Sequence, residues 1–76
     1  MSYSATIVTR EGERRSLPVG SDLELAKKNL VEQALDTCLI GSACYMVITR
    51  PGKQVPAFEA ILTRLTRGFT LEVNTH

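Results

Sequence analysis

Residues 21–41, which read SDLELAKKNLVEQALDTCLIG, decide the fold because they specify an amphipathic helix together with both of its ends. Ser21 and Glu24 have the spacing of a capping box, in which the serine hydroxyl accepts a hydrogen bond from a first-turn amide and the glutamate accepts one from the serine N–H. Gly41 follows the last apolar residues and can adopt the left-handed conformation that ends many helices. The sequence therefore predicts a principal helix over residues 21–41.

The apolar side chains of this helix share one side. They recur at helical spacing and comprise Leu23, Ala26, Leu30, Val31, Ala34, Leu35 and Cys38. Lys27 projects near the middle of this stripe, and we expect its aliphatic stem to lie on the core while the ammonium reaches water. Glu32 and Asp36 lie on the opposite side, in open solvent. We interpret that pair as a solvated face and expect a sheet to cover the apolar stripe.

Two segments before the helix are expected to form a strand hairpin. Residues 3–10 alternate and are rich in β-branched side chains, and residues 13–19 follow after a short connection that contains Gly12. Pro18 has no N–H for a ladder, so the second strand is predicted at a sheet edge or ends early.

Two segments after the helix also read as strands. Residues 43–50 are apolar on both sides, which favours a central position, or a strand with one face under the helix and the other under a partner. Residues 69–74 alternate, and we expect Phe69, Leu71 and Val73 to face inward.

The segment between these strands admits two interpretations. Pro51 and Gly52 predict a type II turn. Beyond it, residues 57–67 carry apolar side chains at i, i+3, i+4 and i+7 and are predicted to form a second, shorter helix. In the alternative, residues 53–58 pair back on the third strand, with Ile48 opposite Val55.

The predicted element order is β-β-α-β-α-β in one domain over residues 1–76. The fold class is α+β, a two-layer sandwich with one mixed sheet and both helices on one face. If the second helix is a strand, a more antiparallel sheet wraps around one helix. A chain of this length buries only about 60% of its unfolded surface, so self-association would add useful stability.

Composition excludes several classes of protein. Nine basic and eight acidic residues give a formal charge of +1, which requires no polyanionic partner. The longest apolar window, residues 39–48, is too short to cross a bilayer, and the first residues do not resemble a signal peptide. Cys38 and Cys44 are too few for a secreted disulfide scaffold, so we expect half-buried free thiols. We expect a cytoplasmic protein without membrane association.

The search for catalytic chemistry is negative. His76 is the only histidine and the last residue, so neither cysteine has a positioned base. A zinc site needs about four ligands, more than these cysteines and the histidine supply. The sequence also has no glycine-rich phosphate motif. We predict no catalytic residue, metal or cofactor.

Basic residues border the predicted turns and the end of the second helix. They are Arg10, Arg14, Arg15, Arg50, Lys53, Arg64 and Arg67. If the turns lie at one end of the sheet, these cations would form a rim that grips phosphates or an acidic protein surface. The competing interpretation is that they only solubilise the protein and complement the helix dipole. Few aromatic residues are present to stack on bases.

The leading functional hypothesis is a non-enzymatic protein-binding module of adaptor or inhibitor type, such as a phage or mobile element encodes. Such a module would bind its partner through a sheet edge, or through the third strand around Tyr45 and Val47 with the basic residues beside it. One form of this hypothesis is a homodimer. A nucleic-acid-binding protein that uses the basic rim is the alternative. A small enzyme subunit is the second alternative.

Overall fold

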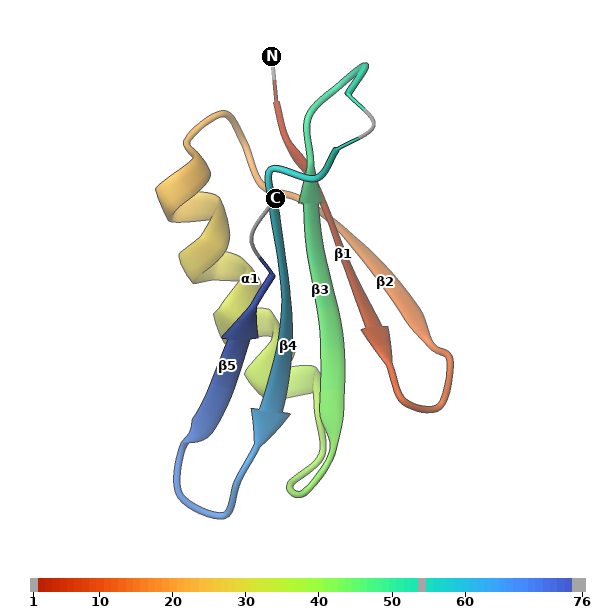
Figure 1. Cartoon of the computed structure of the whole chain (residues 1–76), viewed down its shortest axis with the longest axis vertical. Coiled ribbons are helices and arrows are strands. Elements are labelled where there is room, and N and C mark those ends of the chain that lie inside the picture. Colours follow the sequence, from red (N-terminus) through yellow and green to blue (C-terminus); the bar gives the residue numbers. More distant parts are fainter. Residues whose placement is uncertain (1, 54, 75–76) are drawn as a thin grey trace.

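A computed structural model of the chain describes residues 2–53 and 55–74. The elements, in chain order, are β1 (Ser4–Thr9), β2 (Arg14–Pro18), α1 (Leu23–Thr37), β3 (Ala43–Thr49), β4 (Phe58–Arg64) and β5 (Phe69–Val73) (Figure 1). The α+β class is confirmed, but the observed order is β-β-α-β-β-β.

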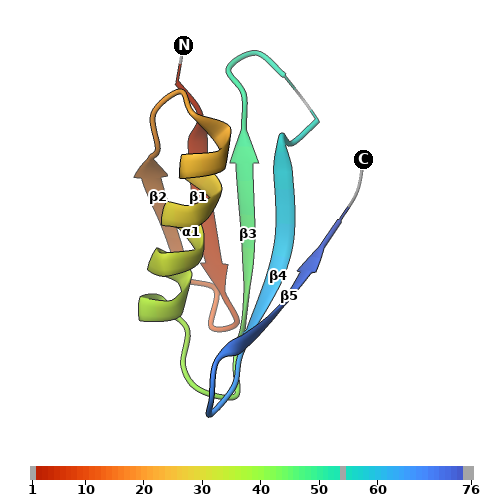
Figure 2. The same cartoon turned by 90° about the vertical axis from the view of Figure 1, so that its left-hand side faces the viewer.

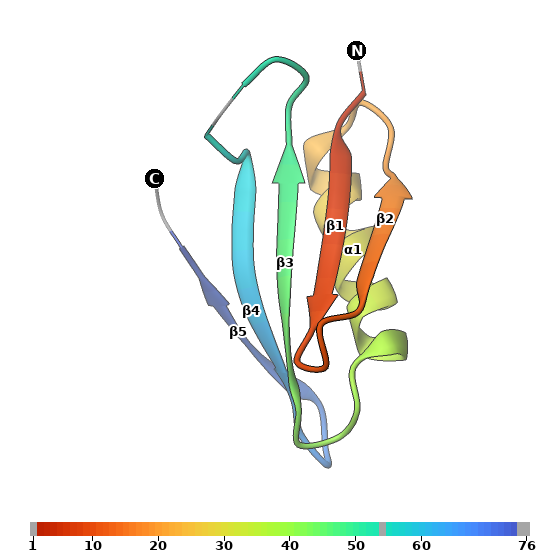
Figure 3. The same cartoon turned by 90° about the vertical axis from the view of Figure 1, so that its right-hand side faces the viewer.

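The strands form one five-stranded sheet in the order β2-β1-β3-β4-β5, and each neighbouring pair is antiparallel. The expectation of a mixed sheet was wrong. The two strands that α1 connects, β2 and β3, do run parallel, but β1 lies between them and is antiparallel to both. Helix α1 packs on one face of the sheet (Figure 2), whereas no other element of the described chain covers the opposite face (Figure 3).

The predicted second helix over residues 57–67 is wrong, because this segment contains strand β4. Phe58, Ala60 and Leu62 are buried, whereas Ile61 between them is exposed, which is the period-two pattern of a strand. A helix this short is marginal by itself, whereas a strand between β3 and β5 gains two ladders of backbone hydrogen bonds. The alternative register was also wrong, because Ile48 lies opposite Phe58.

Both ends of the principal helix differ from the prediction of residues 21–41. The N-cap is Asp22, whose Oδ1 accepts hydrogen bonds from the amides of Glu24 at 3.1 Å and Leu25 at 3.3 Å. A carboxylate is favoured over a hydroxyl at this positive end of the helix dipole. At the other end, α1 stops at Thr37 with Cys38 as C-cap. Gly41 does have a positive φ of 85°, but it belongs to the turn that enters β3.

The core lies between α1 and the centre of the sheet. Ala26, Leu30 and Ala34 of the helix are fully buried against residues of β1, β3 and β4, which include Ile7, Met46, Ile48 and Leu62. The small alanines on either side of Leu30 allow close approach of the helix to the strands.

The two cysteines are more deeply buried than expected. Cys38 is 2% exposed and Cys44 is 1% exposed, and both are free thiols. Burial, together with a hydrogen bond with Cys38, raises the pKa of Cys44 to about 12. At neutral pH Cys44 therefore stays a protonated core residue and is not a nucleophile.

The apolar side of β5 is not buried, contrary to the expectation for Phe69, Leu71 and Val73. These side chains are 40%, 38% and 51% exposed, although their register partners on β4 place them on the same sheet face as α1. The helix contacts β1, β3 and β4, and β5 lies beyond it at the side of the sheet (Figure 2).

Candidate protein-binding surfaces

The predicted basic residues divide between the two ends of the sheet (Figure 1): five lie near one end (Arg10, Arg14, Arg15, Arg64 and Arg67), and Arg50 and Lys53 lie at the other. The turns after β1 and β4, near Arg10 and Arg67, lie at one end of the sheet, and the turn after β3, with Arg50 and Lys53, lies at the other (Figure 1). Strands β3, β4 and β5 form a meander, in which successive turns alternate between the two ends of the sheet, so residues at consecutive turns are separated by a strand length.

Two of the arginines contact the helix. Arg64 donates from Nη1 to the carbonyl oxygens of Leu35 and Cys38, both at 2.9 Å, and so satisfies acceptors at the C-terminus of α1. Arg15 donates from Nη1 to Thr37 Oγ1 at 3.3 Å. These two guanidinium groups stabilise the packing of α1 on the sheet.

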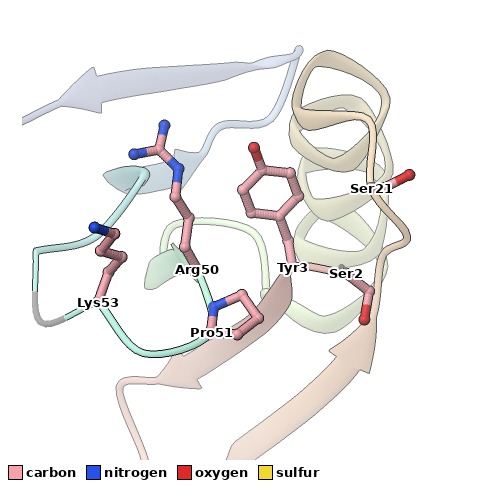
Figure 4. A pocket seen from close by; sticks show the side chains of 6 residues that line it. All are labelled: Ser2, Tyr3, Ser21, Arg50, Pro51 and Lys53. Carbon is pink, nitrogen blue, oxygen red and sulfur yellow. The ribbon is translucent and has the colours of Figure 1, made fainter.

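Arg50 and Lys53 border a pocket of about 270 Å³ at the end of the sheet where β3 stops. Ser2, Tyr3, Ser21 and Pro51 complete its lining. In Figure 4 the guanidinium of Arg50 extends to the same side as the hydroxyl of Tyr3, and the ammonium of Lys53 lies apart from both. The two cations share an opening without converging on a common point.

The open face of the sheet carries the predicted residues Tyr45 and Val47 at its centre. Both are half-buried, and both alternate with β3 residues that lie under α1. The Tyr45 hydroxyl donates to a carboxylate oxygen of Glu59 on the neighbouring strand. This hydrogen bond, together with burial, raises the pKa of Tyr45 to about 12. Ile61 lies opposite Tyr45 in the register of β3 and β4.

On the helix side of the sheet, α1 and β5 border an apolar groove of about 440 Å³. Its walls include Val31 and Leu35 of α1, Phe58 of β4, and Phe69 and Leu71 of β5. Lys27 also lines the groove, and its Nζ is 3.4 Å from Glu24 Oε1 and 5.4 Å from the centre of the Phe58 ring.

Strand β5 also presents a free backbone edge. The amide of Asn74 donates to Glu59 O at 2.9 Å, and the amide of Leu65 donates to Gly68 O at 3.0 Å. Along an antiparallel ladder these bonds assign the even-numbered positions of β5 to β4. The N–H and C=O groups of Phe69, Leu71 and Val73 therefore point away from the sheet.

The opposite edge, β2, is different. The amide of Thr9 donates to Glu13 O at 2.9 Å, so the outward backbone groups of β2 belong to Arg14, Ser16 and Pro18. Pro18 lacks an N–H, and a proline with a charged residue is a common protection of an edge strand. The predicted edge position of Pro18 is confirmed.

The alternation predicted the strand over residues 69–74, but neither the exposure of its apolar side nor the α1–β5 groove was predicted. Alternation in residues 69–74 showed which side chains share a face, but only the position of α1 determines whether that face is covered. A signal was present, since one helix about 10 Å wide cannot cover five strands that lie about 4.8 Å apart.

Comparisons with protein families, curated proteins and solved structures give no match for this chain. Within residues 2–53 and 55–74, no group of three or more His, Cys, Asp or Glu side chains could hold a metal ion. In the same residues, no helix has the length and hydropathy needed to span a bilayer.

Proposed function

We propose that the protein is a non-enzymatic protein-binding module whose partner adds an extended segment to the β5 edge. The observation that supports this proposal is the coincidence of two features in Phe69, Leu71 and Val73. Their backbone groups face the free edge, and their side chains are exposed, with Phe69 and Leu71 lining the α1–β5 groove. Strand addition uses both features, because main-chain hydrogen bonds supply affinity and alternate side chains fill pockets.

The chemistry of the groove suggests what the partner presents. Its lining is almost entirely apolar, with Lys27, Lys28 and Glu32 of α1 along the rim. A partner strand with apolar residues at alternate positions would bury them against Val31 and Leu35. In this proposal the chain acts as an adaptor or inhibitor, and its two buried free thiols agree with a reducing compartment such as the cytoplasm.

The distribution of basic residues weighs against the nucleic-acid alternative. A phosphate backbone is gripped by several cations along one track. Here Arg50 and Lys53 lie at the opposite end from the other five cations, and two of those five, Arg15 and Arg64, hydrogen-bond the end of α1.

Photo-crosslinking tests the proposal. A photoreactive residue at position 71 is expected to capture a protein from an extract of the source cells, and the same residue at position 25 is not. Leu25 is the matched control because it is an exposed leucine, 51% accessible, on a helix surface that does not line the groove.

Substitution gives the second arm of this test. Leu71→Asn should abolish the capture of the partner by an affinity-tagged chain, and Leu25→Asn should preserve it. Binding should also slow hydrogen exchange at the amides of Phe69, Leu71 and Val73. A partner retained by Leu71→Asn would show that the β5 edge is not the binding surface.

A further inference from the structure

The open face of the sheet carries a charge pattern that complements itself. The strand registers place five residues in one row across the face: Arg14 on β2, Val8 on β1, Tyr45 on β3, Ile61 on β4 and Glu72 on β5. The row is therefore cationic at one edge, apolar in the middle and anionic at the other edge. Figure 3 shows this face with no helix in front of it.

The two charged residues cannot satisfy each other within one copy. Four strand spacings of about 4.8 Å separate them by about 19 Å. Both side chains are exposed, and among the described residues neither forms an ion pair. The row resembles one half of an interface in which a second surface supplies the opposite charges.

We propose that a second copy of this chain covers the open face about a two-fold axis that runs along β3. Such an axis places β2 of one copy over β5 of the other, so Arg14 meets Glu72 on both sides of the interface. Tyr45 then packs on its own copy at the centre, and Val8 packs on Ile61. This inference goes beyond the binding of a partner at the β5 edge and concerns a different surface.

The charges discriminate between the possible arrangements of two stacked sheets. An axis in the interface at right angles to the strands would stack Arg14 on Arg14 and Glu72 on Glu72, and both contacts are repulsive. The axis along β3 makes both contacts attractive. It also keeps the strands of the two sheets nearly aligned, as in sandwiches whose sheets pack about 10 Å apart at about −30°.

The expected affinity follows from the area. Five strands about 4.8 Å apart and about 20 Å long give each copy a footprint of about 500 Å², so the dimer covers about 1,000 Å² in total. This is the lower limit for a specific interface. We therefore expect a dimer that dissociates at micromolar concentration. The α1–β5 groove lies on the other side of the sheet and stays open in this dimer.

Sedimentation equilibrium of charge-reversal variants tests the arrangement. Arg14→Glu and Glu72→Arg should each weaken the dimer about tenfold or more, because each places like charges together at both ends of the row. An equimolar mixture of the two variants should form a heterodimer, since Glu at position 14 of one then meets Arg at position 72 of the other. The double variant R14E/E72R should also recover the dimer.

Arg15→Glu is the matched control, because Arg15 pairs with Ile7 and faces α1. It makes the same change of charge one residue away and should leave the dimer unchanged. A wild-type chain that stays monomeric at millimolar concentration would overturn the proposal. So would a dimer that neither reversal weakens, or single variants whose mixture stays monomeric.

The outcome is separable from that of the proposed function. Arg14→Glu removes the dimer contact and leaves Leu71 intact, so capture of a partner at β5 should survive in this variant. Leu71→Asn should abolish that capture and preserve dimerisation.

Discussion

Arg64 joins the end of β4 to the end of α1 through its two hydrogen bonds to the carbonyl oxygens of Leu35 and Cys38. Removal of a charged donor leaves acceptors at a partly buried helix end without a partner, which costs about 1–3 kcal/mol. We therefore expect Arg64→Ala to lower the free energy of unfolding by this amount in urea titrations. Arg67→Ala, in the exposed β4–β5 turn, should change it by less than about 0.5 kcal/mol. Equal losses in the two variants would contradict the capping role of Arg64.

Tyr45 makes stability depend on pH in the alkaline range. Its pKa in the folded protein is about 12, above the ordinary 10.0, so the folded state retains the phenol proton. This contribution is complete below about pH 10 and is lost as pH rises through about 12. Urea midpoints of the wild type should fall relative to those of Tyr45→Phe across this window. Cys44 titrates in both proteins and cancels in the difference, so a constant difference would contradict the prediction.

At the scale of the element, two neighbouring residues, Ser21 and Asp22, both suit the N-cap of α1, and only Asp22 has that role in the structure. Asp22 accepts the amides of Glu24 and Leu25, whereas Ser21 lies one residue earlier. Asp22→Ala should therefore cost about 1 kcal/mol of unfolding free energy. Ser21→Ala should cost only a few tenths, measured by the same urea titration. The reverse order would restore the capping box that the sequence predicted.

The error at the helix start has a physical origin. Ser21 and Asp22 both carry an oxygen acceptor, and Glu24 suits the first turn with either cap. The choice depends on the direction in which the chain enters from β2, which local sequence does not specify. The existence of α1 and its buried face needed no such information, because Ala26, Leu30 and Ala34 follow the helical period.

The error at β4 is of a different kind. Phe58 and Leu62 are buried in the strand, and their spacing of four residues satisfies both the helical and the strand period. Pairing decides between the two structures: Met46 lies opposite Ala60 and Cys44 opposite Leu62. These partners are distant in sequence, so periodicity within residues 57–67 could not reveal them.

At the scale of the whole molecule, the candidate surfaces depend on which strands α1 covers. The sequence showed apolar residues on both sides of the third strand, which is more than the burial of one sheet face requires. Tyr45 and Val47 do lie on the face opposite α1. The sequence also grouped the basic residues at turns, but could not assign the turns to ends of the sheet. The exposed side of β5 arises because a single helix covers only part of a five-stranded sheet.

A core built from one helix on one sheet face concentrates stability in few side chains. For a domain of this length the total free energy of unfolding is about 4–11 kcal/mol. Leu30 is fully buried at the centre of α1, between the alanines that approach the sheet. Leu30→Ala removes apolar contacts and leaves a cavity that the strands cannot collapse into, which costs about 2–5 kcal/mol.

We therefore expect Leu30→Ala to remove about half of the stability, measured as a large fall in the urea midpoint. Leu25→Ala deletes the same atoms from an exposed site of the same helix, so it should cost less than about 0.5 kcal/mol. If the second copy covers the open sheet face, mass action should raise the midpoint of Leu30→Ala as protein concentration increases, because only folded chains associate. This rescue should disappear when Arg14→Glu is added, because that substitution weakens the dimer. It should not change the core itself, since the core and the dimer contact lie on opposite faces of the sheet.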